Sequence, residues 1–343
     1  MAIINKPSEH FETSLYTGTG SSLSISSLDF SPDLTWIKGR SGATEHVLTD
    51  SVRGVTKEIS SNDDGAEETV AQGLTAFNSD GFTVGTDGSY NTSSATYASW
   101  NFKAGGSAST NEVGSIDSSV SVNTTSGFSI VTWTGNGTSG ATLGHGLGVK
   151  PSMIISKNRD ASDNWFCYHK TLGATKYIRL NITNAEGSAT SIWNDTEPTT
   201  SVFSVGNDTA VNSSGVDYVA YCFADVQGYS KMGSYTGNGS TDGTFIYTGF
   251  KPAFIMVKRT DSTADWHIQD IKRDTYNPAD TSLFANTTDV DTTSSGYNTD
   301  FLSNGFKLRG TTTARNGSGA TYIYMAFAEN PFVTSTGVPA TAR

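Results

Sequence analysis

The 343-residue chain lacks several features that would place it in a common class of protein. It has no apolar run of about 18 residues, so we expect no transmembrane helix and no membrane insertion. Its start, MAIINKPSEHF, contains neither an apolar core region nor a cleavage site, so no secretory signal is visible. The formal charge of −11 at pH 7 repels phosphate backbones and argues against nucleic-acid binding.

Cysteine and charge are also scarce. The two cysteines, Cys167 and Cys222, are too few for a disulfide scaffold, and we interpret them as buried reduced thiols because both lie in apolar, strand-like runs. Only 16% of the residues are charged and 35% hydrophobic, whereas 11% are aromatic and 36 are Gly. Abundant Gly, Ser, Thr and aromatic residues favour short strands joined by tight turns. The composition therefore predicts a globular, β-rich chain with thin cores.

Internal repeats are the strongest pattern that the chain does contain. A turn-like motif occurs as YTGTG at Tyr16, WTGNG at Trp133 and YTGNG at Tyr235. Each copy is followed by a Pro, a strand-like run with Lys six residues after that Pro, and a His or Trp eight residues later. A Phe-containing strand and a closing aromatic strand such as TYIYMAFAE complete each copy. Five landmarks in the same order predict three homologous units.

The predicted fold is all-β, with three tandem homologous β-sandwich units of a lectin-like or jelly-roll-like kind. Turn signals recur about every 8–12 residues, and no ten-residue window has a helical period, so we expect helix below about 10%. The predicted boundaries are 1–118 for a first unit with an N-terminal attachment segment, 119–227 for the second, 228–334 for the third, and 335–343 for a flexible tail. Three thin-cored units would gain stability by burying one shared face, which is an argument from composition for a homotrimer.

Three lysines occupy one repeat position, namely Lys38, Lys157 and Lys258, each with an Arg nearby. One interpretation makes them a basic site for an acidic sugar or a phosphate. The other is structural: a charge ends a buried strand and prevents edge pairing. Their recurrence in every unit favours the structural interpretation.

A second charged pattern is the pairing of Asp and Arg three residues apart. Asp50 and Arg53 in the first unit match Asp270 and Arg273 in the third, and such pairs can form bidentate contacts that fix a loop. We therefore predict structural ion pairs at these positions. The second unit has His169 in the Asp position, which we interpret as a structural histidine.

Catalytic motifs are missing from the sequence. It has no G-x-S-x-G elbow, no H-E-x-x-H, no phosphate loop and no zinc-spaced Cys/His cluster. Glycoside hydrolysis needs two carboxylates at a defined separation, and the sequence cannot select a pair among its 33 acids. We predict no enzyme activity and no cofactor. The acidic turns 61–68 and 289–300 could hold Ca²⁺, although neither has a specific calcium motif.

Ligand recognition is predicted where the three copies differ most, because shared landmarks are explained by maintenance of the fold. The most variable stretches are Val55–Gln72, Ala174–Thr200 and Thr275–Thr299. Aromatic rings offer apolar stacking faces for sugars. The candidate binding residues in these stretches are Tyr177, Trp193, Asn194, Tyr276 and Tyr297. For Trp193 two interpretations stay open, a core plug over the sandwich or a sugar-stacking platform.

The landmarks YTGNG, GFKPAFIMVKR, DWHIQD, NGFKLRG and YIYMAFAENPF together resemble a repeat domain of virion proteins from marine tailed bacteriophages. The resemblance covers residues 10–332. It implies a concanavalin A-like sandwich in a tail-fibre or structural protein, and it transfers no catalytic or binding residues.

The resemblance and the composition together predict a non-enzymatic virion protein on the tail or particle surface, assembled in the cytoplasm of the bacterial host. The first hypothesis is a tail-fibre or adhesin component that contacts host-surface glycan. The alternative is a capsid- or tail-decorating protein that contacts only other virion proteins, and a remote alternative is a glycan depolymerase. Fibres of tailed phages are commonly trimers, so the resemblance favours a homotrimer.

Overall fold

Antiparallel β-strands make up the bulk of the ordered structure. The structure is a computed structural model, and it describes residues 4–328, 332–333 and 339–340. Strands account for 42% and helices for 7%, which confirms the all-β prediction and the low helix content. Within these described ranges, no helix is both long and apolar enough to cross a membrane.

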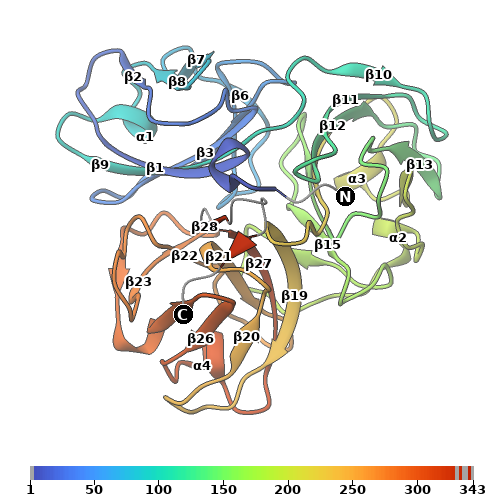
Figure 1. The fold of residues 1–343 in the computed structure, drawn as a ribbon. Coiled ribbons are helices and arrows are strands. Elements are labelled where there is room, and N and C mark those ends of the chain that lie inside the picture. The colour runs from blue at the N-terminus through green and yellow to red at the C-terminus, as the bar shows by residue number, and fades with distance from the viewer. Residues whose placement is uncertain (1–3, 329–331, 334–338, 341–343) are drawn as a thin grey trace.

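The chain forms three lobes, each with one large sheet and one small sheet (Figure 1). We define lobe 1 by strands β1 to β9, lobe 2 by β10 to β18 and lobe 3 by β19 to β27. In lobe 1 the six-stranded sheet has the order β1 (Phe11–Thr17), β9 (Thr96–Phe102), β3 (Leu34–Gly39), β4 (His46–Asp50), β5 (Lys57–Ser60) and β6 (Glu68–Thr69). Its small sheet has the order β2 (Leu23–Ile25), β8 (Gly81–Val84) and β7 (Leu74–Asn78), and the short helices are η1 (Pro7–Glu9) and α1 (Gly88–Asn91).

Lobe 2 contains a seven-stranded sheet. Its order is β10 (Ser109–Asn111), β11 (Ser118–Asn123), β12 (Phe128–Thr134), β18 (Asp217–Phe223), β14 (Met153–Asn158), β15 (Phe166–His169) and β16 (Ile178–Arg179). The small sheet pairs β13 (Ala141–Gly144) with β17 (Val202–Val205), and the helices are α2 (Thr190–Trp193) and α3 (Thr209–Asn212).

Lobe 3 again has a six-stranded sheet. Its order is β19 (Ser230–Thr236), β27 (Thr321–Ala328), β21 (Pro252–Arg259), β22 (His267–Asp270), β23 (Thr281–Phe284) and β24 (Thr292–Thr293). The small sheet is β20 (Phe245–Tyr247), β26 (Gly305–Leu308) and β25 (Thr299–Leu302), with helices η2 (Ser295–Tyr297) and α4 (Thr313–Asn316). A last pair, β28 (Phe332–Val333) and β29 (Pro339–Ala340), follows lobe 3.

The repeated landmarks occupy corresponding places in the three lobes. Each closing aromatic strand, β9, β18 or β27, pairs on both sides, as its apolar character on both faces requires. The strand after each landmark Pro is its neighbour, and their registers correspond: Leu34 faces Phe102, Met153 faces Phe223 and Phe254 faces Phe327. Equal strand order and equal register follow from equal patterns of buried residues, because a one-residue slip would turn every side chain to the other face.

The three large sheets share one hydrophobic core at the centre of the molecule. Phe102, Phe223 and Phe327 meet there, with ring centroids 5.3 to 6.1 Å apart. The same cluster includes large buried side chains from all three lobes, among them Trp100 and Trp266. A separate core lies within each lobe beneath its small sheet. The lobes therefore surround a common centre instead of following one another in a line (Figure 1).

The strand pairing also locates the predicted boundaries. The boundary at 118 coincides with the start of β11, but β10 already belongs to the sheet of lobe 2, so the chain changes sheets between Phe102 and Ser109. The boundary at 227 lies between β18 and β19. In the predicted attachment segment, Ile4 is buried in the central core. Most of the predicted tail 335–343 lies outside the described residues, apart from β29.

Candidate functional site

Of the five predicted binding residues, only Tyr276 has a fully exposed side chain, at 86%. Trp193 is 2% exposed, because α2 turns it into the core of lobe 2, where its ring meets that of Tyr168 edge-on. The binding role predicted for Trp193 is therefore wrong, and of the two interpretations left open the core plug describes it. The polar neighbours in SIWNDTEP do not indicate exposure of the ring, since Asp195 and Thr196 are exposed while the indole points inward.

The other three predicted residues are partly buried and serve the fold. The Tyr177 ring packs edge-on against Phe166 at 4.9 Å. Asn194 adopts the left-handed conformation, with φ of 52°, that ends α2. The Tyr297 ring packs against His267 at 5.0 Å. The structure thus does not bring the five residues together into one site.

The three variable stretches have a different use, because each forms a junction with another lobe. Each stretch therefore packs partly against a neighbouring lobe, so its divergence does not by itself indicate a receptor site. One backbone hydrogen bond at an equivalent place marks each junction: Glu67 N to Arg159 O at 2.7 Å, Glu186 N to Thr260 O at 2.8 Å, and Asp291 N to Arg40 O at 3.0 Å.

The first predicted ion pair lies at the junction of lobes 1 and 2. Arg53 Nε is 2.5 Å from Asp50 Oδ2, and both side chains are wholly buried. Arg53 also contacts Glu67 at 3.1 Å, and Glu67 in turn pairs with Arg159 of lobe 2 at 2.9 Å. From lobe 2, the Tyr221 hydroxyl donates to Asp50 Oδ2 at 2.8 Å. The pair is therefore the inner end of a chain of charges that connects two lobes.

The second ion pair repeats this arrangement between lobes 3 and 1. Arg273 Nε is 2.7 Å from Asp270 Oδ2, again with both side chains wholly buried. Arg273 reaches Asp291 at 3.0 Å, and Asp291 pairs with Arg40 of lobe 1 at 2.7 Å. Trp100 Nε1 of lobe 1 donates to Asp270 Oδ2 at 3.2 Å. None of these groups faces solvent enough to bind a ligand.

The third junction, between lobes 2 and 3, is built differently. His169 replaces the Asp, is fully buried, and its Nε2 lies 3.4 Å from Tyr324 O of lobe 3. Thr260 stands where the other junctions have Arg, because Arg259 comes one residue earlier in the third copy and pairs with Asp261 at 2.7 Å. A one-residue shift visible in the sequence thus removes one ionic chain.

The three repeated lysines are fully buried, so they cannot form a basic site on the surface. Burial lowers the pKa of each to about 8. Their amines donate to backbone carbonyls, in two cases across a junction: Lys38 to Thr288 O at 3.0 Å and Lys258 to Thr183 O at 3.1 Å. They belong to strands that pair on both sides, so the proposed protection of a sheet edge is not their role.

An aromatic face that the sequence interpretation missed lies on the small sheet of lobe 3. We define the lobe 3 aromatic face as Phe245 and Tyr247 of β20 with Lys231 of β19. The exposed fractions of Phe245 and Tyr247 are 43% and 60%, while Ile246 between them is 5% exposed and faces the core. Lys231 Nζ lies 5.3 Å above the Tyr247 ring and donates to Tyr247 O at 2.8 Å. Two rings and a cation thus share one outward face.

Gly305 leaves room for the Phe245 ring on this face. A Cβ on Gly305 of β26 would lie 2.0 Å from Ile246 O and 3.1 Å from the Phe245 ring, so only Gly fits beneath that ring. The Phe245 partner across the strand pair is Lys307, which forms an ion pair with Asp242 at 2.5 Å. The aromatic rings are therefore bordered by charged groups that already have partners.

The aromatic character is particular to lobe 3. The strands β8, β17 and β26 each contain one Phe, and these three residues align the small sheets of the lobes. In that alignment Phe245 occupies the same position as Ser24 in lobe 1 and Thr142 in lobe 2. The position of Tyr247 corresponds to Gly144 in lobe 2. Fold maintenance does not explain exposed rings that two of the three lobes do without. The alternation F-I-Y was visible in the sequence, but loops of unequal length before the landmark Pro concealed the correspondence.

Titratable groups elsewhere give no catalytic arrangement. Burial raises the pKa of both thiols, Cys167 and Cys222, which makes them unreactive. Within the described part of the chain, no group of three or more His, Cys, Asp or Glu side chains could hold a metal ion. Glu58 on β5 is the acid of most interest, because burial raises its pKa to about 7 and its Oε2 is buried without a hydrogen-bond partner among the described residues.

Glu58→Gln should stabilise the protein above pH 7. The carboxyl keeps its proton up to pH of about 7 when folded but loses it near 4.5 when unfolded, so folding stability falls as the pH rises through this window. We expect the variant to be more stable than the wild type by about 2 kcal/mol at pH 8 and equal to it at pH 4. Urea unfolding at both pH values measures this, with exposed Glu112→Gln as control. An unchanged stability at pH 8 would mean that Glu58 is not buried as a charge.

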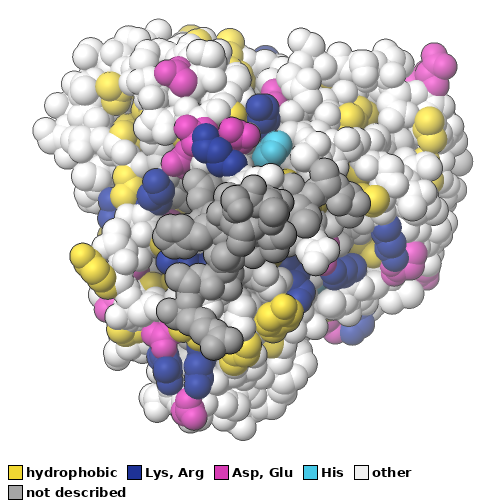
Figure 2. All heavy atoms as spheres, in the orientation of Figure 1, with side chains coloured by type: hydrophobic (Ala, Val, Ile, Leu, Met, Phe, Trp, Pro, Cys, Tyr) yellow, Lys and Arg dark blue, Asp and Glu magenta, His cyan; other side chains and the backbone are white. Residues whose placement is uncertain are grey.

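The visible surface is mostly neither charged nor hydrophobic (Figure 2), as the Ser/Thr-rich composition predicts. A family model described as Domain of unknown function (DUF7483) matches residues 6–331. No match was found among curated proteins or among solved structures.

Proposed function

Since this chain belongs to the family described as Domain of unknown function (DUF7483), a description that names no activity, we propose its function from its sequence and structure. It is a non-enzymatic virion protein of a tailed phage, and its lobe 3 aromatic face binds glycan on the host surface. The virion assignment rests on the resemblance of the repeated landmarks. The glycan assignment rests on the exposed rings of Phe245 and Tyr247.

The three lobes are proposed to be tandem copies of one β-sandwich unit. The common strand order, the matching registers and the five sequence landmarks support this. Copies that share a fold are free to differ on their outer faces, and lobe 3 has acquired the rings. Carbohydrate recognition suits such a face, because the apolar side of a sugar ring packs on an aromatic ring while its hydroxyls reach nearby polar groups.

Two alternatives remain hypotheses. A decorating protein of the capsid or tail would contact only other virion proteins, and electron microscopy of labelled particles would locate it. A glycan depolymerase is the remote alternative, favoured only by the pKa of Glu58 at about 7, which is in the range of a general acid. Incubation with host polysaccharide and an assay for reducing ends, with Glu58→Gln as control, would detect it. A homotrimer would raise the avidity of glycan binding, and analytical ultracentrifugation would show whether the protein forms one.

Tyr247→Ala should weaken glycan binding by about fivefold or more, because a lost stacking contact costs on the order of 1 kcal/mol and the Lys231 amine is no longer held over the ring. Single-site affinity for one or two sugar rings is weak, so the protein should be presented in several copies. We expect biotinylated protein on streptavidin to bind a subset of a glycan array. Titration calorimetry with the best-bound oligosaccharide then compares variants.

Tyr276→Ala is the comparison that separates the lobe 3 aromatic face from the sequence-predicted candidate that stays exposed, because Tyr276 is a more exposed tyrosine in the loop between β22 and β23 of the same lobe. It should bind as the wild type does. Binding that survives Tyr247→Ala and Phe245→Ala together would contradict the assignment of the site. If no assembled form binds any glycan and the particle position is wholly covered, the decorating protein becomes the better proposal.

A further inference from the structure

The outer edges of the three large sheets are treated differently. In lobe 2, β11 pairs along the outer edge of β12, with Ser121 opposite Ile130 and Ser119 opposite Thr132. The strands that correspond to β12 are β1 in lobe 1 and β19 in lobe 3, and each pairs with one large-sheet strand, β9 or β27. Lobe 2 therefore shows what an added strand on this edge looks like.

The edge of β19 is protected by its own lobe. Ser230 exchanges both backbone hydrogen bonds with Val226, and Met232 N donates to Asp225 Oδ1 at 3.0 Å. Thr236 O accepts from the Thr244 hydroxyl at 2.8 Å. Side chains and a short turn thus satisfy groups that a new strand would need.

The edge of β1 has no such protection within the described residues. The hydrogen bonds Gly18 N to Ala95 O and Lys103 N to His10 O set the alternation with β9, so Thr13 and Leu15 direct their N–H and C=O groups away from it. Natural edges usually carry charges, proline or a bulge that prevent pairing. The outward positions of β1 carry none of these: they are Phe11, Thr13, Leu15 and Thr17.

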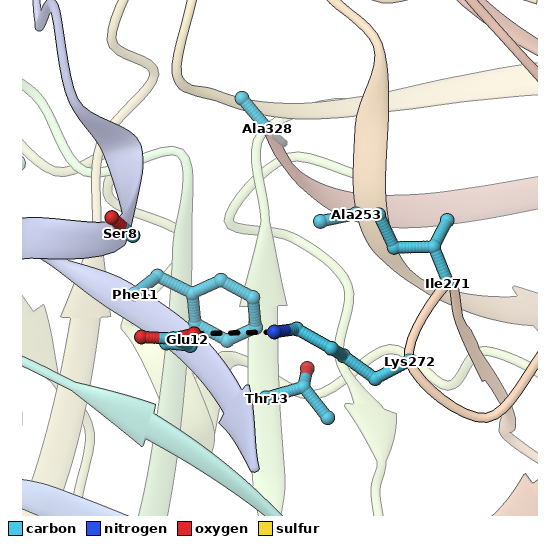
Figure 3. Close-up of a pocket in the computed structure, with 8 residues that line it drawn as sticks. All are labelled: Ser8, Phe11, Glu12, Thr13, Ala253, Ile271, Lys272 and Ala328. Atoms are coloured by element: carbon cyan, nitrogen blue, oxygen red, sulfur yellow. Dashed lines mark hydrogen bonds and ion pairs between the residues drawn. The ribbon is translucent and has the colours of Figure 1, made fainter. Parts of the chain in front are cut away.

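A cavity of about 220 Å³ lies beside this edge, between lobes 1 and 3 (Figure 3). Its far wall is Ala253, Ile271 and Ala328 of lobe 3, and the Lys272 amine reaches across to Glu12 Oε1 at 3.3 Å. Thr13 lines the cavity and is 4% exposed, yet its hydroxyl oxygen is buried with no hydrogen-bond partner in the described residues.

We propose that the β1 edge binds an extended, uncharged strand of a partner protein, in the way that β11 covers β12. The strand would pair with the free backbone groups of β1 and place small or β-branched side chains against the alanines of the far wall. The composition of β11, SSVSVN, shows which chemistry the corresponding edge of β12 accepts in lobe 2. Because lobes 1 and 3 stand on either side of this edge, a single extended strand fits there better than an edge strand that belongs to another folded lobe. This site is separate from the lobe 3 aromatic face and does not depend on glycan binding.

The test uses the full chain and a peptide with the sequence of residues 118–124, SSVSVNT, capped at both ends so that it carries no charge. We expect fluorescently labelled peptide to bind the wild type saturably with one site per chain. Leu15→Pro removes a backbone N–H that points away from β9, so no hydrogen bond within the sheet is lost. The fold should therefore persist, while peptide binding should weaken at least tenfold. Leu15→Lys, a charge of the kind that protects natural edges, is a second variant should the proline variant fail to fold.

Two controls make the result specific. Ser234→Pro changes the corresponding position of the protected β19 edge, and its peptide binding should equal that of the wild type. A peptide with Pro in place of Ser121 should not bind, because the backbone N–H of Ser121 is one of those that face the paired strand. Equal binding by the wild type and both Leu15 variants, or no binding by the wild type, would overturn the proposal. A dimer of the wild type that Leu15→Lys dissociates would also overturn it, since the occupant would then be a second copy.

Discussion

Lowering the pH from 7 to 5 should destabilise the protein strongly. Four of its five histidines are at most 1% exposed, and burial is the main cause that lowers each pKa. The pKa falls to about 4 for two of them and well below the ordinary value of 6.5 for the other two. The four are His46, His145, His169 and His267, of which His145 and His169 have the value of about 4.

The direction of the effect follows from proton linkage. Below pH 6.5 the unfolded chain takes up protons that the folded chain does not, so stability is full above pH 6.5 and is lost as the pH falls toward 4. Each such histidine removes about 1.4 kcal/mol per pH unit, so the four together remove on the order of 5 kcal/mol per unit. Burial raises the pKa of four carboxyls, which act in the opposite direction, and of these Glu58, with a pKa of about 7, acts over the same pH range as the histidines. A typical domain has only about 5–15 kcal/mol of stability to lose.

Urea unfolding followed by tryptophan fluorescence from pH 7.5 to 4.5 measures this dependence. His267→Gln should reduce the slope by about 1.4 kcal/mol per unit, since one protonation site disappears from the unfolded chain. His10→Gln is the comparison, because His10 is only half-buried and should change the slope less. A stability that is flat between pH 7 and 5 would show that these histidines remain able to protonate in the folded state.

Much of the local fold was predictable because it depends on short-range pattern. Alternating apolar residues and Pro at a strand start predicted the positions of strands such as β27 and β21. The central core was not predictable in the same way. A phenylalanine such as Phe327 has the same alternation whether its face meets a small sheet or two other lobes, and no local pattern distinguishes the two. The expected shared face therefore exists, but within one chain, and composition alone no longer calls for a trimer.

The candidate site was predicted poorly for a related reason. Variation between copies was interpreted as a sign of ligand recognition, yet a lobe that contacts a different neighbour at each junction must vary there too. Glu186 occupies the place of Glu67 and Asp291, but it faces Thr260 where those two acids pair with an Arg. The informative variation lies at positions such as Phe245, whose side chain is exposed in lobe 3, and exposure requires the tertiary structure. Trp193 illustrates the converse, a large ring that polar neighbours made look exposed.

Arg273→Ala should cost about 3–5 kcal/mol of folding stability, because it leaves Asp270 buried without its countercharge. Arg53→Ala should cost a similar amount through Asp50. Each variant also breaks the chain of charges to the neighbouring lobe. Thermal and urea unfolding measure the loss, and Arg309→Ala is the matched control. The Arg309 pair with Asp300, at 2.6 Å, is partly exposed, so its removal should cost at most about 1 kcal/mol.

If these ion pairs are structural, their loss should leave glycan binding unchanged. Arg273 lies at the junction of lobes 3 and 1, whereas the proposed glycan site is on the outer sheet of lobe 3, so the folded variant should bind glycan with unaltered affinity. The conservative Arg273→Lys variant should recover only part of the stability, since an amine cannot contact Asp270, Asp291 and Ile268 O as the guanidinium does. If glycan binding were abolished while the unfolding midpoint stayed unchanged, the pair would belong to a binding site and the structural interpretation would be wrong.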